Sequence, residues 1–440
     1  MSGVGQAIEA KRREPEAVLD LLAGRGDVIV GLGNGEPKAT LDAIEYGAAT
    51  AHAGASGTTP AGVLHLHQML PLRERPYISG GVPGLRHVSW FLSPHDKEAF
   101  HQGACDLVPN NFSDVPALMR RSVRDPLVVA AVAPPDGHGF FSLGCHAEYV
   151  AAMVGELPFF VEVNPRMPRT FGENQVHVSQ VEGWCEAETP LVELPAREPR
   201  ETDRKIAELI AERVPDGATI QAGIGAVPGL VLELLGDHRD LGVHTELLCD
   251  GFVDLVERGA VTGTRKRTHR NKLITTSAMG TRRLYEFVAD NPGVEFWPVD
   301  ETNDPRNVAA EPNFNAVNAT IEVDFLGQCA SESLGSDYWS SSGGQPDFAR
   351  GAVMSDGGQS FIALHSTTGD GRHSRIVPQL HAGAAVTTFK NIVDKIVTEH
   401  GVAELRGSSI AERTRRLIAI ADPACRDHLT SEAKRLGYLT

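Results

Sequence analysis

A glycine-rich turn and a glutamate that follows it are the residues of this chain whose types and spacing best suit chemistry. The turn Gly223-Ile224-Gly225 comes after a short apolar stretch that predicts a strand, and Pro228 is suited to open a helix behind it. Such a turn leaves backbone N–H groups free at a helix N-terminus, where the helix dipole also favours negative charge. Glu246 ends a second predicted strand, residues 243–246. Because open α/β sheets bind ligands outside the carboxyl ends of their strands, we expect the turn and Glu246 to face one ligand.

The elements that position this turn occur a second time, earlier in the chain. Residues 26–44 align without a gap with residues 217–235. The identical positions are Gly26 and Gly217, Ile29 and Ile220, Pro37 and Pro228, Leu41 and Leu232. Both stretches give an apolar strand, a glycine turn, a proline and a helix in the same register. This repetition indicates two similar α/β halves. The earlier turn, residues 31–35, is expected either to be a simple connection or to touch ligand as well.

The expected fold class is therefore α/β, with two similar open halves whose mainly parallel sheets are flanked by helices. A length of 440 residues fits two domains. The near-continuous apolar run 127–133 is typical of a strand buried on both faces of a parallel sheet. Residues 186–204 are rich in proline and charge and predict a linker. We therefore expect one half at 1–192 and another at 193–440, which carries Glu246.

Two further stretches carry expectations about secondary structure. The alanine-rich residues 145–154 predict a helix, and residues 296–300 predict a strand followed by a turn at Asn303-Asp304-Pro305.

Composition excludes several classes of partner. A formal net charge of −16 argues against a general nucleic-acid or anionic-membrane surface, because both need a basic face. No apolar run approaches the ~18 residues of a membrane span, and the N-terminal sequence has no apolar signal region. The six cysteines form no CxxC pair, which favours a reducing cytoplasm.

Seven short motifs run along nearly the whole chain. In order they are IQAGIGAVP, LGVHTELLCDGFVDLVERG, MGTRRLYEF, VDETNDPR, SSGGQPDFARGA, SRIVPQL and VTEHGVAELRG. Together they resemble the class I CoA-transferases of the acetyl-CoA hydrolase/transferase family, which includes 4-hydroxybutyrate and butyrate CoA-transferases. The chain departs from typical relatives at Leu247-Leu248-Cys249 and Ser341-Ser342. These departures lie beside the expected site and leave the acyl group open.

The resemblance implies a ping-pong CoA-transferase whose glutamate, Glu246 here, becomes acylated and then carries CoA as a thioester. It associates two loops with CoA and the oxyanion. They contain Gln221, Ala222, Gly223, Ile224 and Gly225 in one case, and Gly343, Gly344, Gln345, Asp347 and Phe348 in the other. CoA would be a substrate and covalent intermediate, with no permanently bound cofactor. The partners would be short-chain or hydroxylated acyl-CoA and small carboxylates such as acetate, and the assembly a homodimer or a dimer of dimers.

Two other functions remain open. Acyl-CoA hydrolysis would use the same glutamyl intermediate with water as the acceptor. A non-catalytic protein that binds a CoA ligand would keep the fold without the adduct.

The remaining candidate residues have structural interpretations beside functional ones. His65 and His67 share one face of a predicted strand near His52, but no third ligand is obvious, so no metal site is expected. Cys249 is expected to be a small buried residue. The basic loop could hold CoA phosphates or be solvated. Its members are Arg265, Lys266, Arg267, His269, Arg270 and Lys272.

Family resemblance also puts Ser366, Thr367, Thr368 and Arg375 near ligand. Arg166 and Arg169 could hold a substrate carboxylate or form surface salt bridges.

Overall fold

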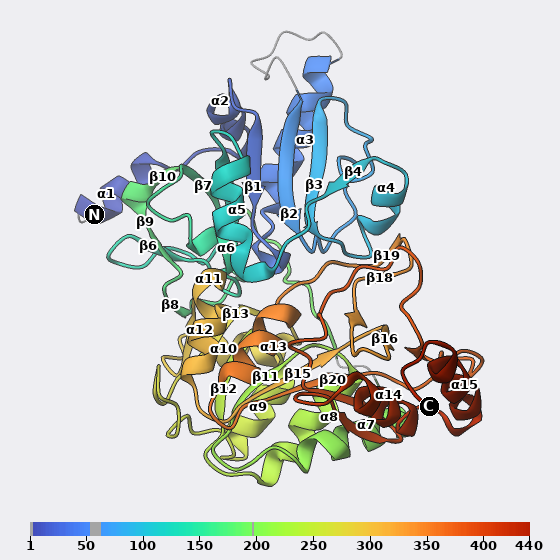
Figure 1. The fold of residues 1–440 in the computed structure, drawn as a ribbon. Coiled ribbons are helices and arrows are strands. Elements are labelled where there is room, and N and C mark those ends of the chain that lie inside the picture. The colour runs from blue at the N-terminus through green and yellow to red at the C-terminus, as the bar shows by residue number, and fades with distance from the viewer. Residues whose placement is uncertain (1–2, 53–62, 196–197) are drawn as a thin grey trace. The chain divides into compact units, whose positions relative to one another are not determined.

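A computed structural model of the chain describes residues 3–52, 63–195 and 198–440. They form two compact α/β units (Figure 1). Unit 1 comprises Met1–Leu194 and Thr275–Glu301, and unit 2 comprises Pro195–Ile274 and Thr302–Thr440. The chain first leaves unit 1 close to the predicted boundary, and residues 196–197 of the predicted linker lie outside the described residues. The prediction differs from the structure for Thr275–Glu301, because this segment returns to unit 1 instead of staying with residues 193–440.

Unit 1 is built on a parallel sheet of seven strands in the order β10-β7-β5-β1-β2-β3-β4. The strands are β1 (Asp27–Val30), β2 (Leu64–Met69), β3 (Leu85–Phe91), β4 (Cys105–Leu107), β5 (Leu127–Val132), β7 (Phe159–Val163) and β10 (Val181–Glu186). Every residue of β5 is buried, as expected for a central strand that is covered on both faces. The predicted class, mainly parallel α/β, is confirmed.

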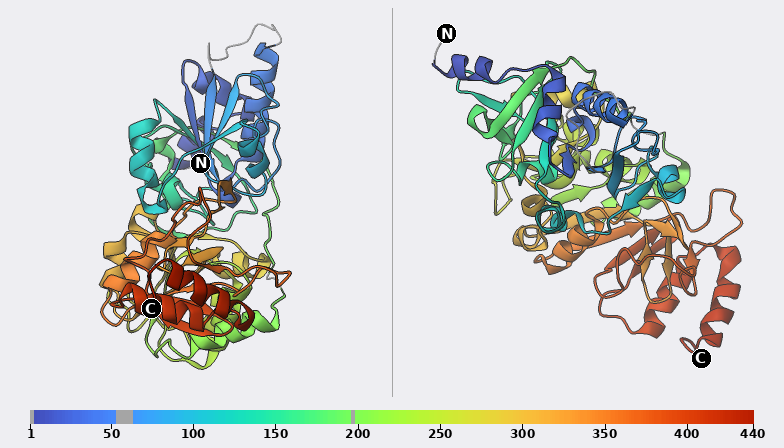
Figure 2. Two further views of the ribbon diagram at one scale, coloured as in Figure 1. Left: turned by 45° about the vertical axis from the view of Figure 1, so that its right-hand side comes forward. Right: turned by 90° about the horizontal axis from the view of Figure 1, so that it is seen from above.

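Helices cover both faces of the unit 1 sheet, and Figure 2 shows blue α3 on one side and teal α5 on the other. The helices are α1 (Gly3–Ala10), α2 (Val18–Leu22), α3 (Lys38–His52), α4 (Lys97–His101), α5 (Val115–Ser122), α6 (Glu148–Ala151) and α10 (Arg282–Val288). Short 3-10 turns are η1 (Pro15–Ala17), η2 (Gly33–Gly35), η3 (Phe112–Asp114) and η4 (Val178–Gln180). Strands β6 (Phe140–Ser142) and β9 (Gln175–His177) pair antiparallel, and β8 (Phe171–Gly172) pairs with β14 (Val294–Phe296).

Unit 2 holds six sheet strands in the order β23-β22-β20-β15-β11-β12, parallel except for the edge pair β22 and β23. They are β11 (Thr219–Ala222), β12 (Gly242–Leu248), β15 (Phe314–Ala319), β20 (Gln359–Ala363), β22 (Lys395–Thr398) and β23 (Gly401–Glu404). The division between the units falls inside β13 (Leu273–Ala278). Small strands are β16 (Glu322–Asp324), β17 (Cys329–Ala330), β18 (Ser333–Leu334), β19 (Asp337–Tyr338) and β21 (Ile376–Val377).

The helices of unit 2 include α8, which follows the glycine turn, and α13, which follows the second glycine loop. They are α7 (Glu201–Ala211), α8 (Ala226–Leu234), α9 (Asp250–Glu257), α12 (Pro305–Ala310), α13 (Gln345–Met354), α14 (Ile410–Ala419) and α15 (Arg426–Arg435), with 3-10 turns η5 (Leu235–Asp237) and η6 (Pro423–Cys425). Helix α13 packs against β15 and β20, and α8 packs against α7. Among the described residues, no helix is both long and apolar enough to span a membrane.

The repeated glycine turns predicted from the sequence both connect a strand to a helix. In unit 1, however, side chains of the protein itself occupy the space beside the turn. The backbone N–H of Leu32 donates to Glu148 Oε1 at 2.9 Å, and His146 Nδ1 lies 2.8 Å from the same oxygen. Glu148 is fully buried with φ of 28°, a conformation that side-chain-bearing residues rarely adopt. A Cβ on Gly35 would lie 2.6 Å from the His146 ring, so only glycine fits there.

Two predicted elements are shorter than the sequence indicated. Only residues 148–151 of the expected helix 145–154 are α-helical. Of the expected strand 296–300, only Phe296 belongs to a strand, and α11 (Val299–Thr302) follows it as a helical turn.

Candidate active site

The centre of the site is Glu246, which lies near the end of β12. The preceding strand residues 242–245 are buried, whereas Glu246 is partly exposed. Its Oε2 accepts a hydrogen bond from Asn303 Nδ2 at 2.7 Å. The backbone of Gly344 donates a second hydrogen bond to the same side chain. The carboxylate is therefore oriented by two donors from distant parts of unit 2.

Gly344 can approach Glu246 only because it has no side chain. A Cβ on Gly344 would clash with Glu246 Oε2 and with Asn303 Nδ2. Gly344 is the residue before α13, and Gly343 precedes it with φ of 56°, in the left-handed region that glycine tolerates best. The sequence pair Gly-Gly thus provides both the turn and the close contact.

Burial raises the pKa of Glu246 to about 7, and the hydrogen bonds from Asn303 and Gly344 oppose this rise. A carboxyl group with this pKa is about half ionised at neutral pH. Glu246 is consequently balanced between its two protonation states, and each of the two donors favours the charged form.

Asn303 was not singled out from the sequence, although it lies within the motif VDETNDPR. It is fully buried, and its Oδ1 has no hydrogen-bond partner among the described residues. His244, two residues before Glu246, donates from Nε2 to the carbonyl oxygen of Thr302 at 2.6 Å. This bond holds the segment that carries Asn303. The only signal in the sequence was a polar residue between Thr302 and the Asp304-Pro305 helix start.

His244 has a structural role in this arrangement. Burial, together with the charge of Lys266, lowers the pKa of His244 to about 3, so its imidazole is neutral. The ring lies edge-on to Phe314 and Phe348, with centroid distances of 5.9 and 6.4 Å. These contacts fix the ring between β15 and α13, and the ring in turn fixes the Thr302 carbonyl.

The glycine turn of unit 2 borders a pocket of about 420 Å³. Gly225 has φ of 136°, which only glycine adopts without strain, and it caps the start of α8. The backbone N–H groups of Ile224 and Gly225 have no partner among the described residues. Both residues line the pocket, so these two donors lie at its wall.

The rest of the pocket lining carries charges of both signs. It includes Glu198, Arg200 and Asp203 at and before the start of α7, the ends of β15 and β20, and Arg375. Burial and the charge of Arg200 lower the pKa of Arg375, while Glu399 raises it. The Arg375 guanidinium makes no hydrogen bond or ion pair within the described part of the chain. Together with the free N–H groups of the turn, the Arg375 guanidinium provides hydrogen-bond donors for an anion within this pocket.

The other residues of the predicted turn face inward. The Gln221 amide pairs with Asn318, at 3.2 and 3.4 Å. The carbonyl of Ala222 accepts from Thr245 Oγ1 at 3.4 Å, and the Gly223 N–H donates to the Val317 carbonyl at 3.1 Å.

The structure therefore brings Gly344 into contact with Glu246, whereas Ile224 and Gly225 line the pocket. The described lining of this pocket does not include Glu246. Glu246 lies on β12, and the turn with Ile224 and Gly225 follows the neighbouring strand β11.

Three other candidate residues of unit 2 are buried or hydrogen-bonded in ways that support the fold. Lys266 Nζ donates to the carbonyl oxygens of Val243 and Lys272, both at 3.0 Å, and so links β12 to the basic loop. Burial raises the pKa of Cys249 to about 11, which keeps its thiol protonated. Ser366 Oγ donates to Glu399 at 2.7 Å.

Two predicted interpretations in unit 1, the shared face of the two histidines and the salt bridges of the two arginines, are confirmed. His65 and His67 do share one face, since both approach Asp27, at 3.7 and 2.9 Å. Arg166 and Arg169 form salt bridges with Glu188 and Asp136.

Comparison with known proteins agrees with the motifs. A model of the acetyl-CoA hydrolase/transferase C-terminal domain matches residues 280–433. The chain is 43% identical over 364 residues to succinyl-CoA:cyclohexane-1-carboxylate CoA transferase of Geobacter metallireducens, covering 82% of this chain and 83% of that protein. It is 39% identical over 376 residues to 4-hydroxybutyrate coenzyme A transferase of Clostridium kluyveri, with 84% and 87% covered. The crystal structure of RipA from Yersinia pestis superposes with a TM-score of 0.89 at 35% identity, covering 99% of both chains. The chain therefore belongs to the acetyl-CoA hydrolase/transferase family.

Proposed function

We propose that this protein is a CoA-transferase that moves CoA between an acyl-CoA and a carboxylic acid through a glutamyl-CoA thioester on Glu246. The observation that carries the proposal is the arrangement of Glu246, whose carboxylate is held by Asn303 and by the Gly344 backbone at the end of a strand. A carboxylate that is oriented, partly desolvated and still ionisable is suited to act as a nucleophile.

The chemistry needs neither ATP nor a redox group, because one thioester is exchanged for another. An oxygen of Glu246 attacks the carbonyl carbon of the acyl-CoA, the carbon–sulfur bond breaks, and an acyl-glutamyl anhydride and CoA thiolate result. The thiolate then attacks the glutamyl carbonyl carbon and releases the donor acid as a carboxylate. The acceptor acid repeats these steps in reverse and leaves as the new acyl-CoA.

Each addition step places negative charge on a carbonyl oxygen, which hydrogen-bond donors must stabilise. The Gly344 N–H and the Asn303 amide are the donors at Glu246. The loop of Gly343 and Gly344 and the turn residues Ile224 and Gly225 are the candidate oxyanion and CoA sites, whereas Gln221, Ala222 and Gly223 hold the turn in place through their own hydrogen bonds. Loss of one such donor typically costs about 10²–10³ in rate.

The hydrogen-bond donors of the pocket beside the turn support CoA as the group that is transferred. CoA carries phosphates at the end remote from its thiol, and Arg375 together with the Ile224 and Gly225 N–H groups offers donors for an anion. The name 4-hydroxybutyrate coenzyme A transferase supports a hydroxylated acyl group, and the name butyryl-CoA:acetate CoA-transferase, of a relative from Anaerostipes caccae, supports a short-chain acyl-CoA with acetate as the partner acid. The Geobacter relative is named for succinyl-CoA and a cyclic carboxylate, so its name does not narrow the acyl group to short chains.

Acyl-CoA hydrolysis is the second candidate, since Glu246 is partly exposed and water could reach the same intermediate. We further propose assembly as a homodimer or a dimer of dimers, which light scattering on the purified chain would test. A reducing cytoplasm is the proposed compartment, because all six cysteines are free.

The decisive experiment is peptide mass spectrometry after incubation with acetyl-CoA or butyryl-CoA, followed by borohydride. The reagent reduces a glutamyl thioester to the alcohol, so the Glu246 peptide should change mass and release CoA. A Glu246→Gln control keeps the shape and should show no change. If the Glu246 peptide stays unmodified while free CoA accumulates, the transferase proposal fails and direct hydrolysis replaces it. Transfer and hydrolysis through the adduct are distinguished by whether acyl-CoA of an added acid is formed.

A further inference from the structure

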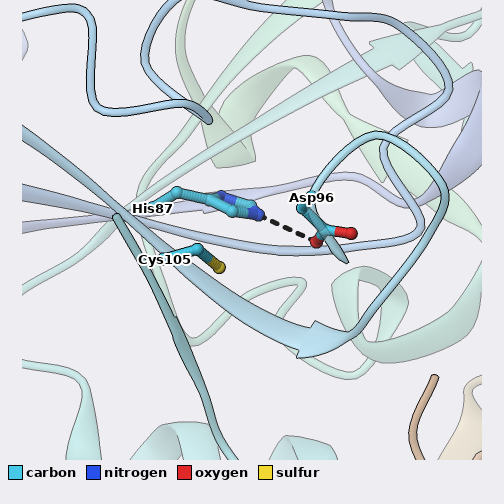
Figure 3. Close-up of side chains that lie close together, drawn as sticks. All are labelled: His87, Asp96 and Cys105. Carbon is cyan, nitrogen blue, oxygen red and sulfur yellow. Dashed lines mark hydrogen bonds and ion pairs between the residues drawn. The ribbon is translucent and has the colours of Figure 1, made fainter. Parts of the chain in front are cut away.

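Unit 1 contains a second convergence of reactive side chains, His87, Asp96 and Cys105 (Figure 3). His87 lies in β3 and Cys105 in β4, and the two are direct partners in the parallel register of these strands. Asp96 is the residue before α4. One potential ligand atom of each lies within 4.8 Å of the other two, and the side chains are 0%, 0% and 3% exposed. Three separate segments thus direct a nitrogen, an oxygen and a sulfur into one buried volume.

The hydrogen bonding of this volume is incomplete among the described residues. His87 Nε2 lies 3.1 Å from Asp96 Oδ2, but His87 Nδ1 has no partner. Ser89 lies two residues further along the same face of β3, and its buried hydroxyl also has no partner. Buried polar atoms are almost always hydrogen-bonded, so two orphans on one strand face call for an additional bound group.

We propose that His87, Asp96 and Cys105 bind a zinc ion with a structural role, and that a water molecule completes its four ligands. Imidazole nitrogen, carboxylate oxygen and thiolate sulfur are the three donor types that Zn²⁺ takes in proteins. Donors around a tetrahedral zinc lie roughly 3.3–3.8 Å apart, given metal–ligand distances of about 2.0–2.3 Å. The observed spread of up to 4.8 Å therefore closes with small side-chain rotations. Coordination uses the thiolate, so the Cys105 proton is released to solvent as zinc enters.

A structural role follows from where the cluster lies. Strand β4 has only three residues and is an edge of the seven-stranded sheet. Edge strands this short depend on other contacts to stay in place. A metal ion bound by residues of β3, β4 and the start of α4 would clip this edge to its neighbour and to the helix. The site involves none of the residues around Glu246, so it is independent of the proposed transferase chemistry.

The competing explanation is a hydrogen-bonded pair of His87 and Asp96 beside a neutral thiol. Metal titration separates the two, because only the zinc site places the Cys105 sulfur on a metal. The full-length chain, freed of any tag and treated with a chelator, is titrated with Co²⁺ and then with Zn²⁺. We expect one Co²⁺ per chain with thiolate-to-cobalt charge-transfer absorption, and loss of that absorption after one equivalent of Zn²⁺.

Two cysteine variants assign the absorption. Cys105→Ser should abolish it, whereas Cys185→Ser should retain it, since Cys185 is buried in the same core but contacts Thr40 instead. Asp96→Asn keeps a residue that suits a helix start and should weaken Co²⁺ binding at least about tenfold. This variant decides the matter if Cys105→Ser does not fold. Absence of charge-transfer absorption in the unmodified protein, or its persistence in Cys105→Ser, would overturn the zinc site.

Discussion

Replacing Asn303 with alanine should make the activity depend on pH in a different range. Asn303 Nδ2 donates to Glu246 Oε2 at 2.7 Å, and this bond stabilises the ionised carboxylate. In the proposed mechanism only that ionised form attacks the acyl-CoA. The profile of kcat/KM should therefore rise with pH through the pKa of Glu246, which is about 7 in the unmodified protein.

The size of the effect follows from the strength of the lost bond. A hydrogen bond to a charged group is worth about 1.5–3 kcal/mol. Since one pKa unit corresponds to about 1.4 kcal/mol, Asn303→Ala should raise the pKa of Glu246 by about one to two units. At pH 7 the ionised fraction then falls from about half to roughly 1–10%, so kcat/KM should fall about 5- to 50-fold. The loss should be largely recovered at alkaline pH.

The assay is steady-state transfer of CoA from butyryl-CoA to acetate, measured from pH 5.5 to pH 9.5, where the span is set by roughly two units on either side of the Glu246 pKa. Asn318→Ala is the matched control, because this amide pairs with Gln221 and should leave the midpoint of the profile unchanged. If Asn303→Ala lowers kcat/KM equally at every pH, with the midpoint still near 7, then Asn303 does not act through the ionisation of Glu246 and the reasoning is refuted.

Three other perturbations test the same site. Gly344→Ala should lower kcat about 10²-fold or more, because the added Cβ displaces the Glu246 carboxylate. Gly229→Ala should not lower kcat, because a Cβ there has open space around it. Equal kinetics for both variants would contradict the close contact between Gly344 and Glu246. Arg375→Ala should raise KM for the acyl-CoA about tenfold with a smaller change in kcat, because Arg375 lines the pocket. Arg372→Ala, at an exposed arginine, should leave KM unchanged. Similar KM values for the two variants would show that CoA does not bind in this pocket. Glu246→Gln should raise the temperature of thermal unfolding at pH 8 and have little effect on it at pH 4. The reason is that the pKa of Glu246 in the folded protein, about 7, lies above the ordinary 4.5, so its deprotonation lowers the stability of the folded protein as pH rises from 4.5 to 7. A gain in unfolding temperature only at pH 4 would contradict that pKa.

Local sequence patterns were sufficient for the elements that carry the site. The strand before the glycine turn, helix α8 and the strand that ends near Glu246 were all predicted close to their observed bounds. Each depends on short-range features, namely apolar runs, a glycine that must adopt positive φ, and a proline in the first helical turn. The class of fold followed from these features and from the fully apolar strand β5.

Contacts over long sequence separations could not be read in the same way. Asn303 lies 57 residues from Glu246, and its place depends on the hydrogen bond between His244 and the Thr302 carbonyl, which leaves no periodic signal. The same holds for the return of the chain to unit 1, because a crossing inside β13 changes neither composition nor hydrophobic pattern. His87, Asp96 and Cys105 meet through strand register and a helix start, not through the close spacing of a familiar metal motif.

The carboxyl group of Glu148 makes the two glycine turns differ in whether their backbone N–H groups are available to a ligand. In unit 1 the Leu32 N–H is already satisfied by a side chain that is covalently tethered to the same fold. A tethered acceptor is present at a constant, very high effective concentration, so a dissolved phosphate or carboxylate competes with it poorly. Removing the carboxyl group, for instance with Glu148→Ala, would leave the Leu32 N–H free to bind a dissolved anion. The same strand-turn-helix unit thus serves two purposes in one chain: in unit 1 its Leu32 donor is used to hold the fold together, and in unit 2 its Ile224 and Gly225 donors stay available at a pocket wall.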